Sequence, residues 1–164
     1  MKEINYEKIK ELIAKLKKSN QTIAIMESCT GGGLANSITD IPGASEVFEF
    51  GAVTYSNKTK IALGGEKMNS AINTYSVYSK EVAEIMASEI AKFANATYGV
   101  GVTGQLGVVD LSNITGESEI NKIYFSIYDS TKEVHLTVCM SLKKLERYEN
   151  KSIIINEIIE RLMD

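Results

Sequence analysis

The feature that most constrains the fold is a short apolar run at residues 22–26, TIAIM, which leads directly into the glycine-rich stretch ESCTGGG at residues 27–33. A continuous apolar run of this length is typical of a strand that is buried on both faces. The three glycines favour a tight turn, from which we predict a helix that extends to about Ile38. A strand, a turn and a helix in this order indicate an α/β protein.

The rest of the chain continues this alternation and ends with a hairpin and a helix. Apolar residues on one face predict helices over residues 6–16, 79–94 and 145–163. Runs rich in β-branched and aromatic residues predict strands over residues 48–56, 98–104, 122–129 and 133–140. A short helix over residues 57–63 is expected to be capped by Asn57 and to end at Gly64 and Gly65. We therefore expect residues 1–164 to form a single domain, a three-layer α/β/α sandwich with a mixed central sheet.

Composition and charge exclude several classes of function. The 164 residues carry a net charge of −3 without a basic stripe, so we do not expect nucleic acid as a partner. No apolar stretch approaches the ~20 residues of a membrane span, and the N-terminus does not resemble a signal peptide, so we expect a cytoplasmic protein that binds no membrane. Two distant cysteines and one histidine do not make a zinc site, and we expect no metal.

The turn at residues 27–33 could carry chemistry. A glycine-rich turn between a strand and a helix points backbone amides at a phosphate or a developing oxyanion, although small residues can equally serve close packing. A nucleophilic serine there needs a base, and the local candidates are Lys58 and Lys60, with Tyr55 at the end of the preceding strand. A lysine acts as a base only if its pKa is lowered, and both lysines are otherwise residues of a solvated helix face. Cys29 is better interpreted as a small buried hydrophobe than as the nucleophile.

The sequence of residues 26–65 resembles the signature block of the CinA C-terminal domain family, the nicotinamide mononucleotide amidohydrolases also described as competence or damage inducible proteins. Three submotifs agree in order and spacing: ESCTGG, the run TDIPGAS with its phenylalanine, and VTYSN followed by a lysine. The continuations VYSKEVAEIMA and YGVGVTG also fit the family, so the resemblance covers most of the chain.

The resemblance implies a three-layer α/β/α domain that hydrolyses the carboxamide of nicotinamide mononucleotide to the acid and ammonia. The family uses a serine nucleophile with a lysine and a tyrosine and without metal or cofactor, which implies catalytic roles for Ser28, Lys60 and Tyr55. On this interpretation a neutral Lys60 accepts the Ser28 proton directly or through Tyr55. The amides of Cys29, Thr30, Gly31 and Gly32 are then expected to hold the oxyanion.

Further positions match the substrate-binding residues of the family. Ser45 and Thr103 are expected to line the ligand site, although both could instead cap helices or satisfy turn amides. Arg147 is the counterpart of the phosphate-binding arginine, and its alternative is a solvated residue in the first turn of the last helix. Many members of the family carry an N-terminal pterin-binding-like domain, and we expect this chain to be a stand-alone form.

Two segments depart from the family pattern. The glycine- and proline-rich loop is replaced around residues 105–120 by a sequence without proline, and the Phe-x-Gly-x-Arg segment is replaced by MSLKKLERYENK. These departures leave two alternatives to the amidohydrolase: a nucleotide-binding protein without turnover, and a hydrolase of a different small carboxamide. We favour the amidohydrolase because the nucleophile motif is retained, and we expect a symmetric dimer that acts on a small nucleotide.

Overall fold

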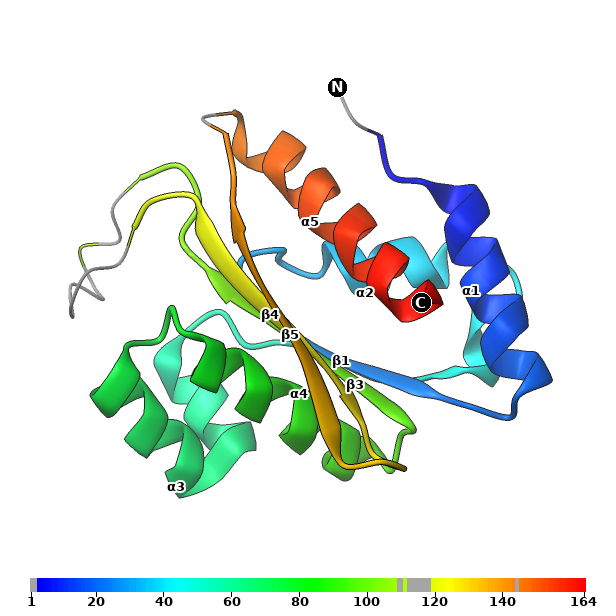
Figure 1. Cartoon of the computed structure of the whole chain (residues 1–164), viewed down its shortest axis with the longest axis horizontal. Helices are drawn as coiled ribbons and strands as arrows, with labels where there is room; N and C mark the ends of the chain where they lie inside the picture. Colours follow the sequence, from blue (N-terminus) through cyan, green and yellow to red (C-terminus); the bar gives the residue numbers. More distant parts are fainter. Residues whose placement is uncertain (1–2, 109–110, 112–118, 144) are drawn as a thin grey trace.

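The computed structural model describes residues 3–108, 111, 119–143 and 145–164, and it has an α/β architecture (Figure 1). Residues 109–110 and 112–118 of the divergent segment at 105–120 lie outside the described residues. The elements in chain order are α1 Tyr6–Lys18, β1 Ile23–Glu27, α2 Gly33–Thr39, the 3-10 helix η1 Ala44–Glu46, β2 Phe48–Val53, α3 Asn57–Tyr75, α4 Lys80–Ala94, β3 Tyr98–Gly104, β4 Lys122–Asp129, β5 Val134–Ser141 and α5 Arg147–Met163.

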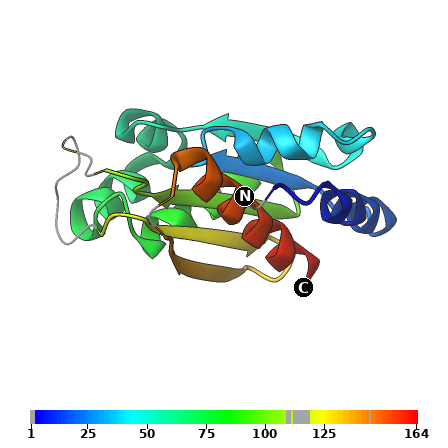
Figure 2. The ribbon, with the colours of Figure 1, turned by 90° about the horizontal axis from the view of Figure 1, so that it is seen from above.

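The five strands form one mixed sheet in the order β2-β1-β3-β4-β5, and Figure 2 looks onto the sheet with the strands side by side in this order. Strand β1 is parallel to both β2 and β3, whereas β3, β4 and β5 are joined antiparallel. Helices α1, α2 and α5 cover one face and α3 and α4 cover the other (Figure 1). The prediction of an α/β fold with a mixed central sheet between helical layers is confirmed.

The two faces of the sheet carry separate cores. Because side chains alternate along a strand, Ile23 and Ile25 of β1 face one layer, while Ala24 and Met26 face the other. Toward α1, α2 and α5 the core is aliphatic and includes Ile9, Leu12, Leu34, Ile154 and Ile158. Toward α3 and α4 it includes Met68, Val82, Met86 and Ile90. No helix within the described residues is long and apolar enough to cross a membrane.

Strand β3 and helix α4 approach each other closely through glycine. A Cβ atom on Gly99 would lie 1.9 Å from the carbonyl oxygen of Ala87, and one on Gly101 would lie 2.3 Å from that of Ala83. The glycines of the YGVGVTG strand therefore admit the backbone of α4 to the surface of the sheet, which any side chain at these two positions would prevent.

Several helix boundaries differ from the prediction, most of all the end of α3. The helix predicted to end at Gly64 and Gly65 continues as α3 to Tyr75, with only Gly65 in a non-helical conformation (φ 61°, ψ −152°). It continues because Met68 and Ala71 of its second half are buried in the core. The cap is Ser56, whose hydroxyl accepts a hydrogen bond from the amide of Thr59 at 3.2 Å, so Asn57 is the first helical residue rather than the cap. Helix α5 begins at Arg147, two residues later than predicted.

The chain connections mark one place on the sheet for a ligand. After β1 the chain enters α2 on one face, and after β2 it enters α3 on the opposite face (Figure 1). In open α/β sheets, ligands bind beyond the carboxyl ends of neighbouring strands whose connections diverge in this way. The residues that follow β1 and β2, beginning with Ser28 and Thr54, lie at this point.

Candidate active site

The turn that carries Ser28 is held in shape by Glu27, the last residue of β1. One carboxylate oxygen of Glu27 accepts hydrogen bonds from the amides of Gly32 and Leu34, both at 3.1 Å, and the other accepts one from Ala35 at 2.8 Å. The carboxylate thus satisfies the free amides at the start of α2 and lies at the positive end of that helix. Gly32 itself has a φ of 90°, a backbone conformation that suits glycine.

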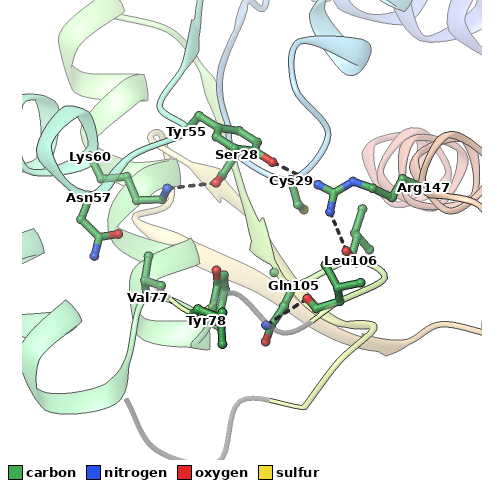
Figure 3. Close-up of a pocket in the computed structure, with 13 residues that line it drawn as sticks. Ser28, Cys29, Tyr55, Asn57, Lys60, Val77, Tyr78, Gln105, Leu106 and Arg147 are labelled. Carbon is green, nitrogen blue, oxygen red and sulfur yellow. Dashed lines mark hydrogen bonds between the residues drawn. The ribbon is translucent and has the colours of Figure 1, made fainter. Parts of the chain in front are cut away.

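Ser28 and Lys60 form a buried pair beyond the ends of β1 and β2. Since Glu27 points toward α2, alternation along the chain points Ser28 to the opposite face, where α3 begins. Nζ of Lys60 lies 2.9 Å from Oγ of Ser28 and also donates to the carbonyl oxygen of Thr54 at 2.6 Å. Lys60 is only 1% exposed and Ser28 only 6%. Figure 3 shows the amine pointing at the hydroxyl.

The surroundings of Lys60 favour its neutral form. Burial lowers the pKa of Lys60 from 10.5 to about 8, and the neighbouring Cys29 only partly opposes this effect. Among the described residues, no carboxylate pairs with Lys60 to stabilise its charge. With this pKa, roughly a tenth of Lys60 is unprotonated at pH 7, and the lone pair of such an amine lies within hydrogen-bonding distance of the Ser28 hydroxyl.

Tyr55 and Arg147 form a second pair at the mouth of the same region. Tyr55 is 62% exposed, and its hydroxyl accepts a hydrogen bond from Arg147 at 3.0 Å. The guanidinium also donates to the carbonyl oxygen of Leu106 at 2.6 Å. The contact between Lys60 and Ser28 is direct, so of the two predicted proton routes the geometry favours the one that does not pass through Tyr55.

The Cys29 side chain is a poor nucleophile. The thiol is 3% exposed, and burial raises its pKa to about 12, although hydrogen bonding to its own backbone and the charge of Lys60 lower it slightly. A protonated thiol is neither a nucleophile nor a metal ligand. Its interpretation as a small buried hydrophobe agrees with its place in the core beneath α2 and α5.

The backbone amides of the turn are not equally available. The amide of Gly31 donates to the carbonyl oxygen of Ser28 at 3.0 Å, and that of Gly32 is bound by Glu27. Within the described part of the chain, the amide of Thr30 has no hydrogen-bond partner, and the amide of Cys29 interacts only with its own thiol. Of the four residues whose amides were expected to hold an oxyanion, Cys29 lines the cavity described below and Thr30 does not.

A cavity of about 410 Å³ opens beside the Ser28–Lys60 pair, and this volume suits a small-molecule ligand. Its lining residues come from the ends of β1, β2 and β3, from α3 and the segment after it, and from the start of α5 (Figure 3): Ser28, Cys29, Tyr55, Asn57, Lys60, Val77, Tyr78, Gly104, Gln105, Leu106, Val108, Leu111 and Arg147. Two of them are basic, and none of the described lining residues is acidic. The cavity therefore favours an anionic ligand.

The structure brings together five of the ten residues predicted for the site: Ser28, Cys29, Tyr55, Lys60 and Arg147. Thr30, Gly31 and Gly32 lie in the turn but do not line the cavity. The hydroxyl of Thr103 donates to the carbonyl oxygen of Val77 at 2.9 Å and supports the cavity wall from behind. Ser45 is exposed in η1, just before the amino end of β2, whereas the cavity lies at the carboxyl end of that strand.

Sequence reasoning missed several polar residues of the site: Asn57, Tyr78 and Gln105 line the cavity, and Glu27 holds the turn. Glu27 could have been identified, because an acidic residue shortly before a predicted helix start is a common helix cap. Gln105 follows the VTG motif in the divergent segment, where neither spacing nor resemblance indicates a role. Gln105 lines the cavity although it is only 3% exposed.

Known proteins resemble this chain in sequence and in fold. The model of the CinA C-terminal domain family matches residues 5–164. A protein of Thermoanaerobacter sp. strain X514, provisionally named competence-damage inducible protein, is 37% identical over 138 residues, which is 84% of this chain and 32% of the relative. A protein of Clostridium botulinum strain Loch Maree with the same provisional name is 38% identical over 157 residues, 95% of this chain and 36% of the relative. The chain thus spans about a third of the length of these curated relatives.

Solved structures share the fold at lower sequence identity. The competence/damage inducible protein CihA from Agrobacterium tumefaciens superimposes with a TM-score of 0.87 at 23% identity, covering 99% of this chain and 98% of that one. A CinA superfamily protein from Escherichia coli gives a TM-score of 0.84 at 19% identity, covering 95% of this chain and 87% of that one.

Proposed function

The chain belongs to the CinA C-terminal domain family, and from that premise we propose that it hydrolyses the carboxamide of nicotinamide mononucleotide to give nicotinate mononucleotide and ammonia. The observation that carries the proposal is the buried contact of 2.9 Å between the amine of Lys60 and the hydroxyl of Ser28. An amine that burial makes partly neutral is a base, and a serine hydroxyl beside it is a nucleophile for acyl transfer.

The first half of the reaction forms an acyl-enzyme. Oγ of Ser28 attacks the carboxamide carbon while its proton passes to Nζ of Lys60. The carbonyl oxygen gains the negative charge, for which the amide of Cys29, the residue that follows Ser28 and lines the cavity beside it, is the donor that we assign. When the carbon–nitrogen bond breaks, the ammonium of Lys60 returns the proton to the departing nitrogen. Ammonia leaves, and the acyl group stays on Ser28 as an ester.

The second half consumes one water molecule. Lys60, neutral again, accepts a proton from the water as its oxygen attacks the ester carbon. The bond to Ser28 then breaks, and the ammonium of Lys60 returns the proton to the serine oxygen. The products are the pyridine carboxylic acid nucleotide and the free enzyme, so one amide and one water give one acid and one ammonia.

The basic end of the cavity suits the phosphate of the nucleotide. Arg147 lines the cavity, and its guanidinium is positioned by the hydroxyl of Tyr55 and the carbonyl oxygen of Leu106. Neither of these partners carries a negative charge, so the charge of the guanidinium remains available to an anion. On this proposal Tyr55 acts at the phosphate end by holding Arg147.

The test is ammonia release from nicotinamide mononucleotide by the wild type and by Ser28→Ala, Lys60→Met and Lys58→Met. Lys58 is an exposed lysine on the same helix and provides the matched control. We expect activity in the wild type and in Lys58→Met, and a loss of at least ~1000-fold in the other two, each checked for folding. A folded wild type that binds the nucleotide without releasing ammonia would indicate a binding protein. Release from other carboxamides alone would indicate a different hydrolase.

A further inference from the structure

Gln105 lines the cavity and carries a buried hydrogen-bond acceptor without a partner among the described residues. Its backbone is fixed on both sides, because its amide donates to the carbonyl oxygen of Lys122 at 3.3 Å and its own carbonyl oxygen accepts from Asn121 at 2.8 Å. Its side-chain nitrogen donates to the carbonyl oxygen of Val108 at 3.2 Å. The side-chain oxygen, Oε1, is buried and has no partner among the described residues.

The orientation of this amide follows from its neighbour. A backbone carbonyl oxygen only accepts hydrogen bonds, so the group that faces Val108 must be the NH₂ end of the side chain. The oxygen is therefore the end that is left over. A buried acceptor without a donor costs about 1–3 kcal/mol, and proteins rarely retain one unless something else supplies the donor.

The position of Gln105 distinguishes its side-chain oxygen from the other buried oxygens that lack a hydrogen-bond partner. Within the described residues, two further buried side-chain oxygens lack a partner, those of Thr30 and Asn150. Neither residue lines the cavity, whereas Gln105 does. Figure 3 shows Gln105 across the cavity from the Ser28–Lys60 pair, and Arg147 in a third direction. A ligand with its carboxamide at Ser28 and its anionic group at Arg147 leaves the third side of the cavity, where Gln105 lies, for its middle part.

We propose that Oε1 of Gln105 accepts a hydrogen bond from a hydroxyl of the substrate, so that this residue selects carboxamides that carry a hydroxylated sugar. The inference rests on the proposed function, and in nicotinamide mononucleotide the donor is a ribose hydroxyl. A carbonyl oxygen attracts donors and repels carboxylate and phosphate oxygens. Gln105 therefore also directs the anionic end of the substrate away from itself and toward Arg147.

The experiment compares nicotinamide mononucleotide with its 2′-deoxy and 3′-deoxy analogues, using wild type, Gln105→Leu and Gln105→Glu. Leucine removes both polar ends of the side chain. Glutamate keeps an acceptor but cannot donate to Val108. For the wild type we expect a loss of roughly tenfold in kcat/KM with one of the two analogues, mostly through KM. Gln105→Leu should lose a similar factor on the parent nucleotide and should no longer distinguish it from that analogue.

The glutamate variant separates recognition from a structural role. If Gln105 only held the loop through Val108, both variants would lose the same factor on all three nucleotides, and that result would overturn the inference. If Oε1 accepts the hydroxyl, Gln105→Glu keeps the discrimination that Gln105→Leu loses. Thermal unfolding of each variant establishes that it is folded.

Binding measurements distinguish failure of this inference from failure of the proposed function. Calorimetric titration of the same three nucleotides into Ser28→Ala, with and without Gln105→Leu, measures recognition without turnover. Ammonia release with no coupling between Gln105 and a hydroxyl overturns the inference alone. Coupling in binding without ammonia release from the wild type overturns the function and supports the inference. Neither binding nor release overturns both.

Discussion

Replacing Lys60 by methionine should abolish activity and yet stabilise the protein at neutral pH. The unfolded chain has an ordinary lysine pKa of 10.5, and the folded protein has one of about 8. Each pKa unit corresponds to ~1.4 kcal/mol, so keeping Lys60 protonated in the fold costs about 3 kcal/mol at pH 7. Methionine has a similar length and no charge, and it avoids this cost.

The increase in the free energy of unfolding is smaller than this cost, because methionine cannot make the hydrogen bonds of Lys60. Lys60 donates to the carbonyl oxygen of Thr54 and contacts the hydroxyl of Ser28, and losing two such bonds costs ~1–2 kcal/mol in total. We therefore expect Lys60→Met to raise the free energy of unfolding by about 1–2 kcal/mol at pH 7. Urea unfolding of both proteins measures this difference.

The pH dependence gives the decisive test. Between the folded pKa and the unfolded pKa, the unfolded chain binds one more proton than the folded protein, so wild-type stability rises with pH across this window. Below about pH 8 the cost of charging is fully present, and it falls to ~1 kcal/mol by pH 10. The advantage of Lys60→Met should therefore shrink by about 2 kcal/mol between pH 7 and pH 10. The exposed control Lys58→Met should differ from wild type by less than ~0.5 kcal/mol at both values. An advantage of Lys60→Met that does not change with pH would refute the desolvation of Lys60.

Three further outcomes follow from the site. The kcat/KM for ammonia release should rise about tenfold per pH unit below pH 8 and level off above it, because only neutral Lys60 is a base. A profile that is flat from pH 6 to pH 9 would contradict this role of Lys60. Glu27→Gln should lower the free energy of unfolding by at least ~2 kcal/mol in urea unfolding and reduce activity, because the NH₂ group of glutamine would face amides that need an acceptor. Unchanged stability would show that the three hydrogen bonds accepted by Glu27 are dispensable. Iodoacetamide should add one label to the folded protein, at the exposed Cys139, and mass spectrometry that finds label on Cys29 would contradict its burial and raised pKa.

Local patterns in the sequence were enough to predict most of the architecture. The strand at residues 22–26, the hairpin strands and helix α4 each have a periodicity that belongs to one kind of element, and all are found near the predicted positions. The second half of α3 was missed because two glycines ordinarily end a helix. It forms because burial of Met68 outweighs that local preference, and burial depends on the partner elements rather than on the local sequence.

The candidate site was less accessible to sequence reasoning. Local pattern did not distinguish Lys58 from Lys60, and the role of Lys60 was predicted only from the family resemblance. The structure buries Lys60 next to Ser28 and leaves Lys58 exposed, which depends on how α3 packs and not on the local sequence. Ser45 lies in a motif of the family, but strand β2 separates it from the cavity: Ser45 precedes the amino end of this strand, and the cavity lies at the carboxyl end. Gln105 could not be identified because an unsatisfied oxygen is a property of the folded arrangement.

The alternation of side chains at the end of β1 explains how a carboxylate can lie next to the nucleophile Ser28 in sequence without pairing with Lys60, the base that contacts this serine. Glu27 and Ser28 are consecutive, so their side chains point to opposite faces of the sheet. The carboxylate is bound by the amides at the start of α2, and it is not among the groups that set the pKa of Lys60. If Glu27 faced Lys60, the ion pair would raise the lysine pKa and remove the base at neutral pH. One carboxylate therefore fixes the turn that presents Ser28 while Lys60 is left without a counter-ion.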